Sequence, residues 1–284
     1  MQEYAAILCV KGIMIGSIYA LISLGFNVIY RTTGVLNLAQ GEFVMWGGVM
    51  AGWAHGIMGW PLGGAILTGV IGTVLVGLVV DQVAIRPARG SAPVVQIIIT
   101  VGISIVLRSM AALIWGTEPY HLPPIQGGGV HFLGVFLEYQ SLWLLGVVAV
   151  CMTALALFFM YARLGRAMRA CAENAEASRL CGVSPDRMSA MAFGLSALLA
   201  GLGGVLLTPI LSMSFDRGTM LGLKGFSAAI LGGLGHPIGG VFSGLFLGVL
   251  EQFSVWYSSV YKETLALSIV VLVLLFRPRG LFTR

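Results

Sequence analysis

Residues 161–187, YARLGRAMRACAENAEASRLCGVSPDR, form the one long polar stretch in a chain of 284 residues that is otherwise strongly apolar. Apolar runs lie on both sides of it, and they are long enough to cross a bilayer, which takes about 20 residues. The polar stretch carries five arginines and three acids: Arg163, Arg166, Arg169, Arg179, Arg187, Glu173, Glu176 and Asp186. A short basic segment between membrane spans is where a soluble partner can hold a membrane protein. The sequence therefore predicts a membrane subunit that works with partners rather than a self-sufficient enzyme.

The composition of the chain is that of a membrane protein. Hydrophobic residues make up 58%, charged residues make up 10%, and the mean hydropathy is +0.95, whereas soluble domains carry about 25% charged residues. The 40 glycines are expected where membrane helices pack closely through small residues. No polar segment is long enough to bury a core of its own, so we expect a single transmembrane domain over residues 1–284.

Eight apolar runs predict an all-α, polytopic fold with about eight transmembrane helices. They cover residues 7–30, 36–54, 61–84, 94–116, 141–162, 188–208, 238–256 and 261–276. The segment 222–237 is also apolar, but several glycines and a proline interrupt it, so we expect a re-entrant or broken helix there. Such a backbone is tolerated at membrane depth only inside protein or beside a water-filled path.

The basic residues indicate how the chain is oriented. They gather at the ends of apolar runs, in three clusters: Arg86 and Arg89; residues 163–187; and Arg277, Arg279 and Arg284. Because cytoplasmic loops carry an excess of Lys and Arg, these clusters are predicted to be cytoplasmic. Topology thus explains the net charge of +5, and no nucleic-acid partner is indicated. The loop 117–140 has no Lys or Arg, so it is predicted to be extracytoplasmic. Three spans separate the N-terminus from the cytoplasmic loop of Arg86 and Arg89, so the N-terminus is predicted to be extracytoplasmic as well.

This orientation requires an even number of crossings between residues 163–187 and a cytoplasmic C-terminus, but only three clear spans lie there. Three solutions remain open. Either residues 215–237 cross as well, or one apparent span is re-entrant, or the C-terminus lies outside. The basic tail disfavours the last.

Within the polar stretch, residues 166–181 have the pattern of one amphipathic helix, which Gly182 would end. Ser184, Pro185 and Asp186 predict the start of the next helix, with a capping serine, a proline at the first helical position and an acid near the positive end of the dipole. The pattern alone leaves two interpretations open, a solvated connector or a helix that docks on a partner.

Four blocks of the chain resemble the permease subunits of the branched-chain, or hydrophobic, amino acid family of ABC importers, and more closely the shorter of the two permeases. The blocks are GSIYALISLGFNVIYRTTGVLNLAQGEFVMWGG (16–48), VAIRPARG (83–90), LGRAMRACAENAEASRLCGV (164–183) and KGFSAAILGGLGHPIGGVFSGLFLGVLE (224–251). In the third block, Glu176-Ala177-Ser178 followed by Gly182 is similar to the EAA loop of ABC importers, with serine in place of the last alanine. In that family the loop is the coupling helix, which seats in a groove of the ATPase.

The resemblance implies the rest of the assembly. It implies a multi-pass protein of the bacterial cytoplasmic (inner) membrane, with a second homologous permease, two ATPase subunits that bind the ATP, and an extracytoplasmic substrate-binding protein. No cofactor is expected in this chain. The implied cargo is a branched-chain or other hydrophobic amino acid, with urea, amides or aromatic acids as alternatives. The implied ATPase-coupling residues are Arg166, Arg169, Glu173, Glu176, Ala177, Ser178 and Gly182.

Polar residues and glycines inside the predicted spans are candidates for the translocation path, since buried polar groups in membranes usually face protein or water. The candidates are Asn37, Gln40, Glu42, Gly232, Gly233, Gly235 and Glu251. The first three are equally suited to a hydrogen-bond network between helices, and the family often has histidine at the position of Gln40. Asp81 is expected to pair with Arg86 or Arg89. Three partners are open for Lys224, a substrate carboxylate, a docked binding protein and lipid headgroups, of which the headgroups are the expected one. Arg108, well inside a span, needs an acid, water or a route to the interface.

The sequence does not support ATP hydrolysis or metal binding by this chain. The glycine-rich AILGGLGHPIGG (229–240) lacks the Lys-Ser/Thr pair of a phosphate loop, so the chain is not expected to hydrolyse ATP. Its four histidines and four cysteines have no metal-ligand spacing. An ion-coupled secondary transporter using Glu42 and Glu251, and a channel, remain as alternatives. The EAA-like loop argues against both, because neither needs a coupling helix.

Overall fold

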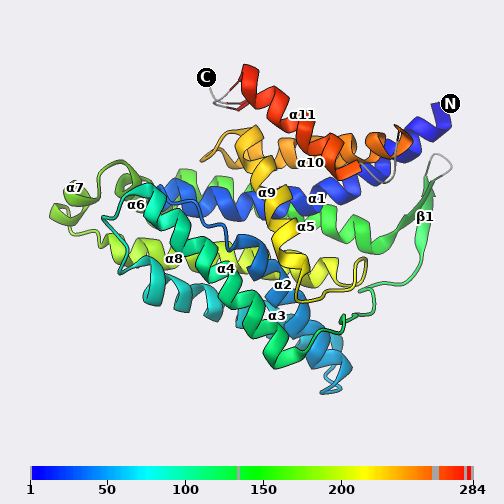
Figure 1. The fold of residues 1–284 in the computed structure, drawn as a ribbon, viewed down its shortest axis with the longest axis horizontal. Coiled ribbons are helices and arrows are strands. Elements are labelled where there is room, and N and C mark those ends of the chain that lie inside the picture. The colour runs from blue at the N-terminus through cyan, green and yellow to red at the C-terminus, as the bar shows by residue number, and fades with distance from the viewer. Residues whose placement is uncertain (1, 133–134, 258–261, 278–279, 283–284) are drawn as a thin grey trace.

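The computed structural model describes residues 2–132, 135–257, 262–277 and 280–282, and the regular secondary structure of this part consists of helices and one hairpin (Figure 1). The elements in chain order are α1 (Gln2–Thr33), α2 (Gln40–Gly56), α3 (Leu62–Val80), the π-helical turn η1 (Asp81–Ile85), α4 (Pro93–Trp115), β1 (Gly129–Phe132), β2 (Val135–Glu138), α5 (Tyr139–Tyr161), α6 (Arg163–Glu173), α7 (Ala175–Leu180), α8 (Pro185–Leu207), α9 (Arg217–Gly232), α10 (Pro237–Tyr257) and α11 (Lys262–Phe276).

Six helical segments of the described chain are long and apolar enough to cross a membrane. They are Ile7–Thr33, Leu62–Ile85, Pro93–Trp115, Tyr139–Tyr161, Pro185–Leu207 and Pro237–Val255. The predicted spans 36–54 and 261–276 correspond to α2 and α11, which are shorter, at 17 and 15 residues. The all-α polytopic class is therefore confirmed, with six full-length spans supplemented by shorter helices.

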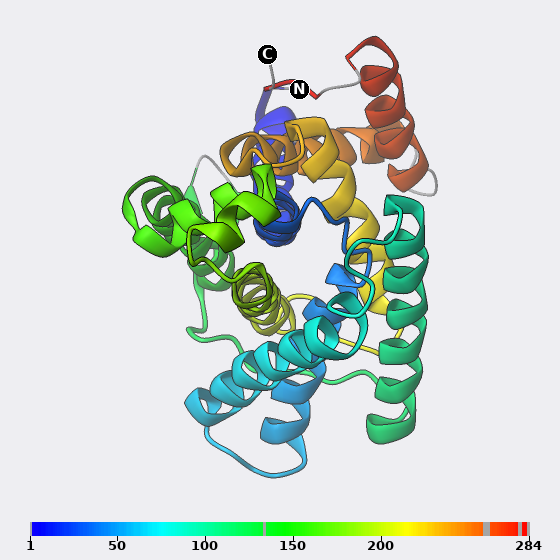
Figure 2. The same ribbon diagram turned by 90° about the vertical axis from the view of Figure 1, so that its left-hand side faces the viewer.

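Glycines allow α1 and α10 to pack with their backbones in contact. Gly240, Gly244 and Gly248 recur every fourth residue, on one face of α10. A Cβ atom at Gly244 would meet the backbone of Ala20, and one at Gly248 would meet the backbone of Gly16. This small-residue packing brings membrane helices together without a hydrophobic driving force between them. Figure 2 shows α1 end-on, inside the ring of other helices.

The same kind of contact joins α2 and α3 to α8. A Cβ at Gly47 would meet the backbone of Gly201 in α8, and one at Gly77 of α3 would meet Ala197. The opposite face of α3 and η1 is an exposed apolar stripe at every fourth residue: Leu67, Ile71, Leu75, Val79 and Val83. The helix thus buries its small residues against protein and presents its large ones outward, as a membrane surface requires.

The two ends of the helix bundle carry different structural elements. Helices α6 and α7 lie at one end, while the β1–β2 hairpin and the start of α1 lie at the other (Figure 1). The predicted loop 117–140 contains this antiparallel hairpin, in which Gly129 pairs with Glu138. A bridge between Tyr120 and Met213 ties the loop to the segment before α9.

Helix α9 occupies the segment whose path through the membrane the sequence left open. It ends beside residues 280–282, where Leu281 N donates to Leu231 O at 2.8 Å. The turn after α9 also reaches the far part of α1, because Gly235 N donates to Asn27 Oδ1 at 2.7 Å. Helices α8, α9, α10 and α11 therefore run along the bundle in alternating directions, which favours the alternative in which residues 215–237 cross. The 16 residues of α9 rise only about 24 Å, and α9 is not among the six segments that are long and apolar enough to cross by themselves.

The glycine contact between α1 and α10 yields a test of packing. Gly248→Ala places a methyl group against the backbone of α1, and such overpacking should lower the free energy of unfolding by about 1–3 kcal/mol. Thermal unfolding in detergent, followed by circular dichroism, measures the effect. Gly146→Ala in α5 is the matched control, because a Cβ there meets nothing within 4 Å. Equal melting temperatures for the two variants would contradict the close contact.

Candidate functional site

The polar stretch folds as two helices, so the prediction of one helix over 166–181 is wrong. Asn174 separates α6 from α7 with extended backbone angles (φ −154°, ψ 102°). Its side-chain Oδ1 accepts a hydrogen bond from Ala177 N at 2.9 Å. Asparagine competes with helix geometry through such local bonds. Asn174 therefore ends α6 and caps α7, which changes the direction of the chain.

The residues expected to couple to an ATPase are divided between these two helices. Arg166 and Glu173 are exposed on α6, and Arg169 is half-buried. Glu176 and Ala177 are exposed on α7, whereas Ser178 is buried and its hydroxyl donates to Asn174 O at 2.8 Å. At the tip, Leu180 is 91% exposed. Helix α7 thus projects from the end of the bundle (Figure 1) with an open surface of small and charged side chains.

The predicted stop and restart after α7 are confirmed. Gly182 has a φ of +81°, which favours glycine. Ser184 caps α8, with Pro185 at its first position. One helix therefore ends before Gly182 and the next begins at Pro185, as the sequence predicted.

Ion pairs link the basic loop after η1 to the start of α8. Arg89 pairs with both Asp81, at 3.2 Å, and Asp186. Arg86 pairs with Asp186 at 3.4 Å. Asp81 also accepts from the Ser189 hydroxyl at 2.6 Å. The predicted pairing of Asp81 is confirmed for Arg89, and Asp186 links both arginines to the helix that follows α7.

Gln40 joins three helices. Its Oε1 accepts from the Ser196 hydroxyl of α8 at 2.7 Å, and its Nε2 donates to Ser196 O at 3.3 Å. The same hydroxyl lies 2.9 Å from Gly25 O of α1. Asn37 precedes α2, and its Oδ1 accepts from Ala39 N at 3.2 Å. Gln40 thus has the interhelical hydrogen bonds that were one of the two alternatives, whereas the hydrogen bond of Asn37 is local and joins no helices.

Glu42 points to a different side of α2 and is fully buried. Ser104 Oγ of α4 donates to Glu42 Oε1 at 3.0 Å, and Thr219 Oγ1 of α9 donates to the same oxygen at 2.9 Å. Thr219 in turn accepts from Arg108 Nη1 at 3.4 Å. Arg108, the arginine inside a span, is thus linked to an acid through one hydroxyl group. Gly218 permits this approach, because a Cβ there would collide with the Glu42 carboxylate.

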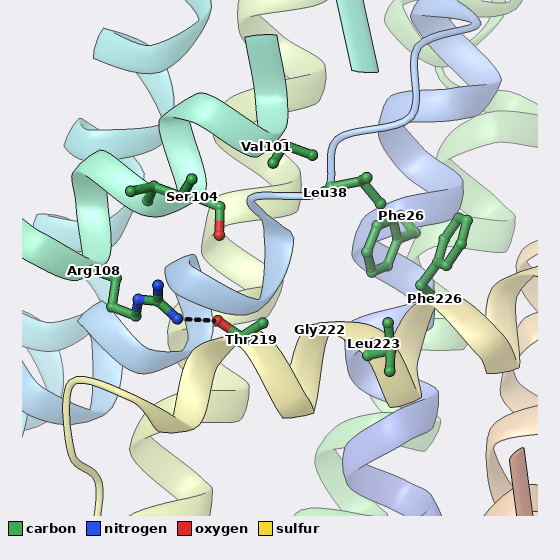
Figure 3. Close-up of a pocket in the computed structure, with 10 residues that line it drawn as sticks. Phe26, Leu38, Val101, Ser104, Arg108, Thr219, Gly222, Leu223 and Phe226 are labelled. Carbon is green, nitrogen blue, oxygen red and sulfur yellow. Dashed lines mark hydrogen bonds between the residues drawn. The ribbon is translucent and has the colours of Figure 1, made fainter. Parts of the chain in front are cut away.

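A cavity of about 230 Å³ lies beside this cluster, between α4 and α9. Ser104, Arg108 and Thr219 line its polar end. The other end is apolar and is lined by Phe26, Leu38, Val101, Leu223 and Phe226. Figure 3 shows Arg108 and Thr219 at one side and the two phenylalanines at the other.

Lys224 and Glu251 form a buried ion pair, so the expected contact of Lys224 with lipid headgroups is wrong. Their Nζ and Oε1 atoms lie 2.9 Å apart, and the residues are 9% and 3% exposed. The Tyr19 hydroxyl donates to Glu251 Oε2 at 2.6 Å. The Lys224 ammonium also lies 5.4 Å from the centre of the Tyr19 ring. The three residues connect α9, α10 and α1 within the bundle.

The candidate glycines form the turn between α9 and α10. Gly233 and Gly235 have positive φ, at 91° and 85°. A Cβ at Gly232 would collide with the backbone of Gly239. The predicted break is therefore a tight turn at the α6–α7 end of the bundle. It lies away from the Glu42 cluster.

Several residues of these clusters escaped the sequence analysis. Tyr19, Ser104, Ser196 and Thr219 supply the hydroxyl groups that hold Glu251, Glu42 and Gln40. Hydroxyl side chains occur throughout membrane helices, so no pattern in one sequence distinguishes these four. For Arg108, the arginine within a predicted span, the sequence indicated that the side chain needs a partner but not that this partner is Thr219.

Membrane-length helices that enclose a Lys–Glu ion pair, with a polar helical segment projecting from one end, are the architecture of a multi-pass membrane protein. The family described as branched-chain amino acid transport system permease component matches residues 8–276. The chain belongs to this family.

Individual relatives agree with this membership. The chain is 35% identical to the LivH permease protein of the high-affinity branched-chain amino acid transport system of Salmonella typhimurium, over 96% of this chain and 94% of LivH. It is 34% identical to the BraD permease protein of Pseudomonas aeruginosa, over 97% and 94%. Identity to the LivM permease protein of Escherichia coli is 27%, over 93% of this chain but 67% of LivM. The resemblance to the shorter type of permease is confirmed.

The buried ion pair yields a test by double substitution. Lys224→Met or Glu251→Gln alone breaks the pair and leaves one group without its counterpart, which should cost about 3–5 kcal/mol of unfolding free energy. The double variant leaves no buried charge at this site and should recover most of that loss. Thermal unfolding of the four proteins in detergent gives the coupling between the two sites. Losses that simply add would show that the two groups do not interact.

Proposed function

We propose that this chain is a transmembrane subunit of an ABC importer that carries branched-chain amino acids across a bacterial cytoplasmic membrane. It would act with a second homologous permease, two ATPase subunits that bind ATP, and an extracytoplasmic binding protein. Membership of the branched-chain permease family supports the cargo class. Similarity to both LivH and LivM supports pairing with a second, related permease.

The observation that carries the coupling role is the projecting segment α6–α7. Its outer surface combines small and charged side chains, with Glu176 and Ala177 exposed on α7. Small residues let another protein approach the backbone closely, and the charges can fix its position. A site of this kind suits the docking surface of an ATPase subunit.

Movement of α6 would reach the bundle through direct contacts. Gly165 of α6 packs against the backbone of Phe158 at the end of α5, because a Cβ there would collide with it. Arg31, in the last turn of α1, lies 5.2 Å from the ring centre of Phe159. On the other side of α7, Asp186 ties the start of α8 to Arg89. A push on α6–α7 would therefore act on α1, α5 and α8 together.

The contacts of Glu251 do not favour the alternative function, an ion-coupled secondary transporter. Such a carrier would use Glu42 and Glu251 as ion or proton sites. Glu251 is already bound to Lys224 and Tyr19. One oxygen of Glu42 accepts two hydroxyl hydrogen bonds, and its other oxygen is buried without a hydrogen-bond partner among the described residues. Uptake that requires ATP, and stops when ATP is removed from membrane vesicles, distinguishes the importer from this rival.

Reversal of one charge tests the docking surface. Glu176→Lys should reduce amino acid uptake to background, since the exposed carboxylate would become a cation at the ATPase contact. The protein should remain in the membrane, because Glu176 is exposed on α7. Uptake of labelled leucine by cells and the amount of protein in their membranes are measured together.

Glu118→Lys is the matched control for this substitution. Glu118 is also exposed, but it lies in the loop that the orientation predicts to be extracytoplasmic. Its reversal should leave uptake near the unaltered level. Normal uptake by a well-expressed Glu176→Lys variant would refute the coupling role.

A further inference from the structure

We propose that the cavity between α4 and α9 is a recognition site for the amino acid within the permease. Arg108 would bind the carboxylate of the cargo, and the apolar end of the cavity would receive its side chain. This inference rests on the proposed function, because it takes the cargo to be an apolar amino acid.

The size of the cavity fits such a molecule. A water molecule occupies about 30 Å³ in the liquid, and pockets for drug-sized ligands measure roughly 300–1,000 Å³. The cavity volume of about 230 Å³ lies between these values, so it has room for a small metabolite.

The polar end is arranged to receive an anion. A guanidinium group has five N–H donors in a planar fork that matches a carboxylate. Among the described residues, the Arg108 side chain makes one hydrogen bond, to the neutral hydroxyl of Thr219 at 3.4 Å. Its remaining donors are available to a carboxylate in the cavity. A charged residue within a membrane span is costly and usually serves function.

Glu42 positions the hydroxyl groups around Arg108. Ser104 and Thr219 both donate to Glu42 Oε1, so the oxygen of Thr219 keeps a lone pair for the guanidinium. The carboxylate of Glu42 itself is fully buried behind these two hydroxyls. Glu42 therefore holds Thr219 in place beside Arg108 without contacting the guanidinium itself, so it leaves the side of the guanidinium that faces the cavity open.

The apolar end suits a branched aliphatic side chain. The rings of Phe26 and Phe226 lie 5.5 Å apart at an angle of 47°. Leu38, Val101 and Leu223 complete that end. A molecule that combines a carboxylate with an apolar side chain would satisfy both ends at once, which neither a purely polar nor a purely apolar molecule would do.

Another cavity with charged residues in its lining, about 200 Å³ in volume, offers a weaker case. There Lys224 is already paired with Glu251 at 2.9 Å. A cargo carboxylate would have to compete with a buried ion pair, whereas at Arg108 it would meet an uncommitted part of the guanidinium.

Substitution of Arg108 tests the polar end. The complete transport complex is reconstituted in vesicles, and ATP-driven uptake of labelled leucine is measured. Arg108→Gln should lower uptake at least about tenfold, the factor expected for loss of a charge-assisted hydrogen bond. Arg108→Lys keeps the charge and should retain an intermediate rate. Copurification of the ATPases and the second permease verifies that each variant assembles.

A substitution at the apolar end tests specificity. Val101→Trp introduces a larger side chain at that end, so it should exclude leucine more strongly than valine, which is smaller. The leucine-to-valine uptake ratio should fall at least about threefold, a modest effect for one methylene group. Because the binding protein is the same in every vesicle, a changed ratio originates in the permease. Leu113→Trp, on the same helix but outside the cavity and 86% exposed, should keep the ratio unchanged.

The outcomes separate this inference from the function on which it rests. Wild-type uptake of leucine, together with an unchanged rate in assembled Arg108→Gln and an unchanged ratio in Val101→Trp, would overturn the recognition site alone. An assembled wild-type complex that carries neither leucine nor valine would overturn the cargo of the proposed function and this site with it. A reduced rate and a shifted ratio, with the Leu113→Trp control unaffected, would support the site.

Discussion

The backbone contact between α1 and α10 is the constraint on which much of the bundle depends. Glycines every fourth residue on α10 let the two helices approach until no Cβ would fit between them. This approach brings Glu251 of α10 within reach of Tyr19 of α1. The turn before α10 is held by Asn27. Helix α9 is thereby fixed beside α1, where it can contribute to both polar clusters.

Helix α9 separates two charged sites that differ in how their charges are satisfied. On one side Lys224 forms a buried pair with Glu251 and contacts Tyr19, an arrangement that links three helices. On the other side Thr219 mediates between Glu42 and Arg108, and a cavity adjoins the arginine. A buried charge that is fully paired serves the fold, whereas one that keeps donors free beside a cavity is suited to binding. Rotation or displacement of α9 would alter both sites.

The polar end of the bundle links those sites to a surface that a soluble partner can reach. Asn174 bends the chain between α6 and α7, and the aspartate at the start of α8 holds the loop after η1. Helix α6 sits against the ends of α5 and α1, while α8 carries Ser196, the partner of Gln40. A force applied at α7 would thus enter the bundle through helices that are already hydrogen-bonded to α2. Helix α2 is also the helix that carries Glu42.

The sequence by itself determined the polytopic helical class, the polar segment with its stop at Gly182, the family, and the residues whose charge needed a partner. These features depend on local composition, on capping chemistry and on the resemblance of whole blocks. It did not determine that Asn174 divides the polar helix, or that Lys224 pairs with Glu251 rather than with headgroups. It also gave no sign that Thr219 joins Arg108 to Glu42, 66 residues apart. Only the tertiary structure decided these points, because each depends on which helix faces lie together, and glycine-mediated packing sets those faces through contacts that no local pattern records.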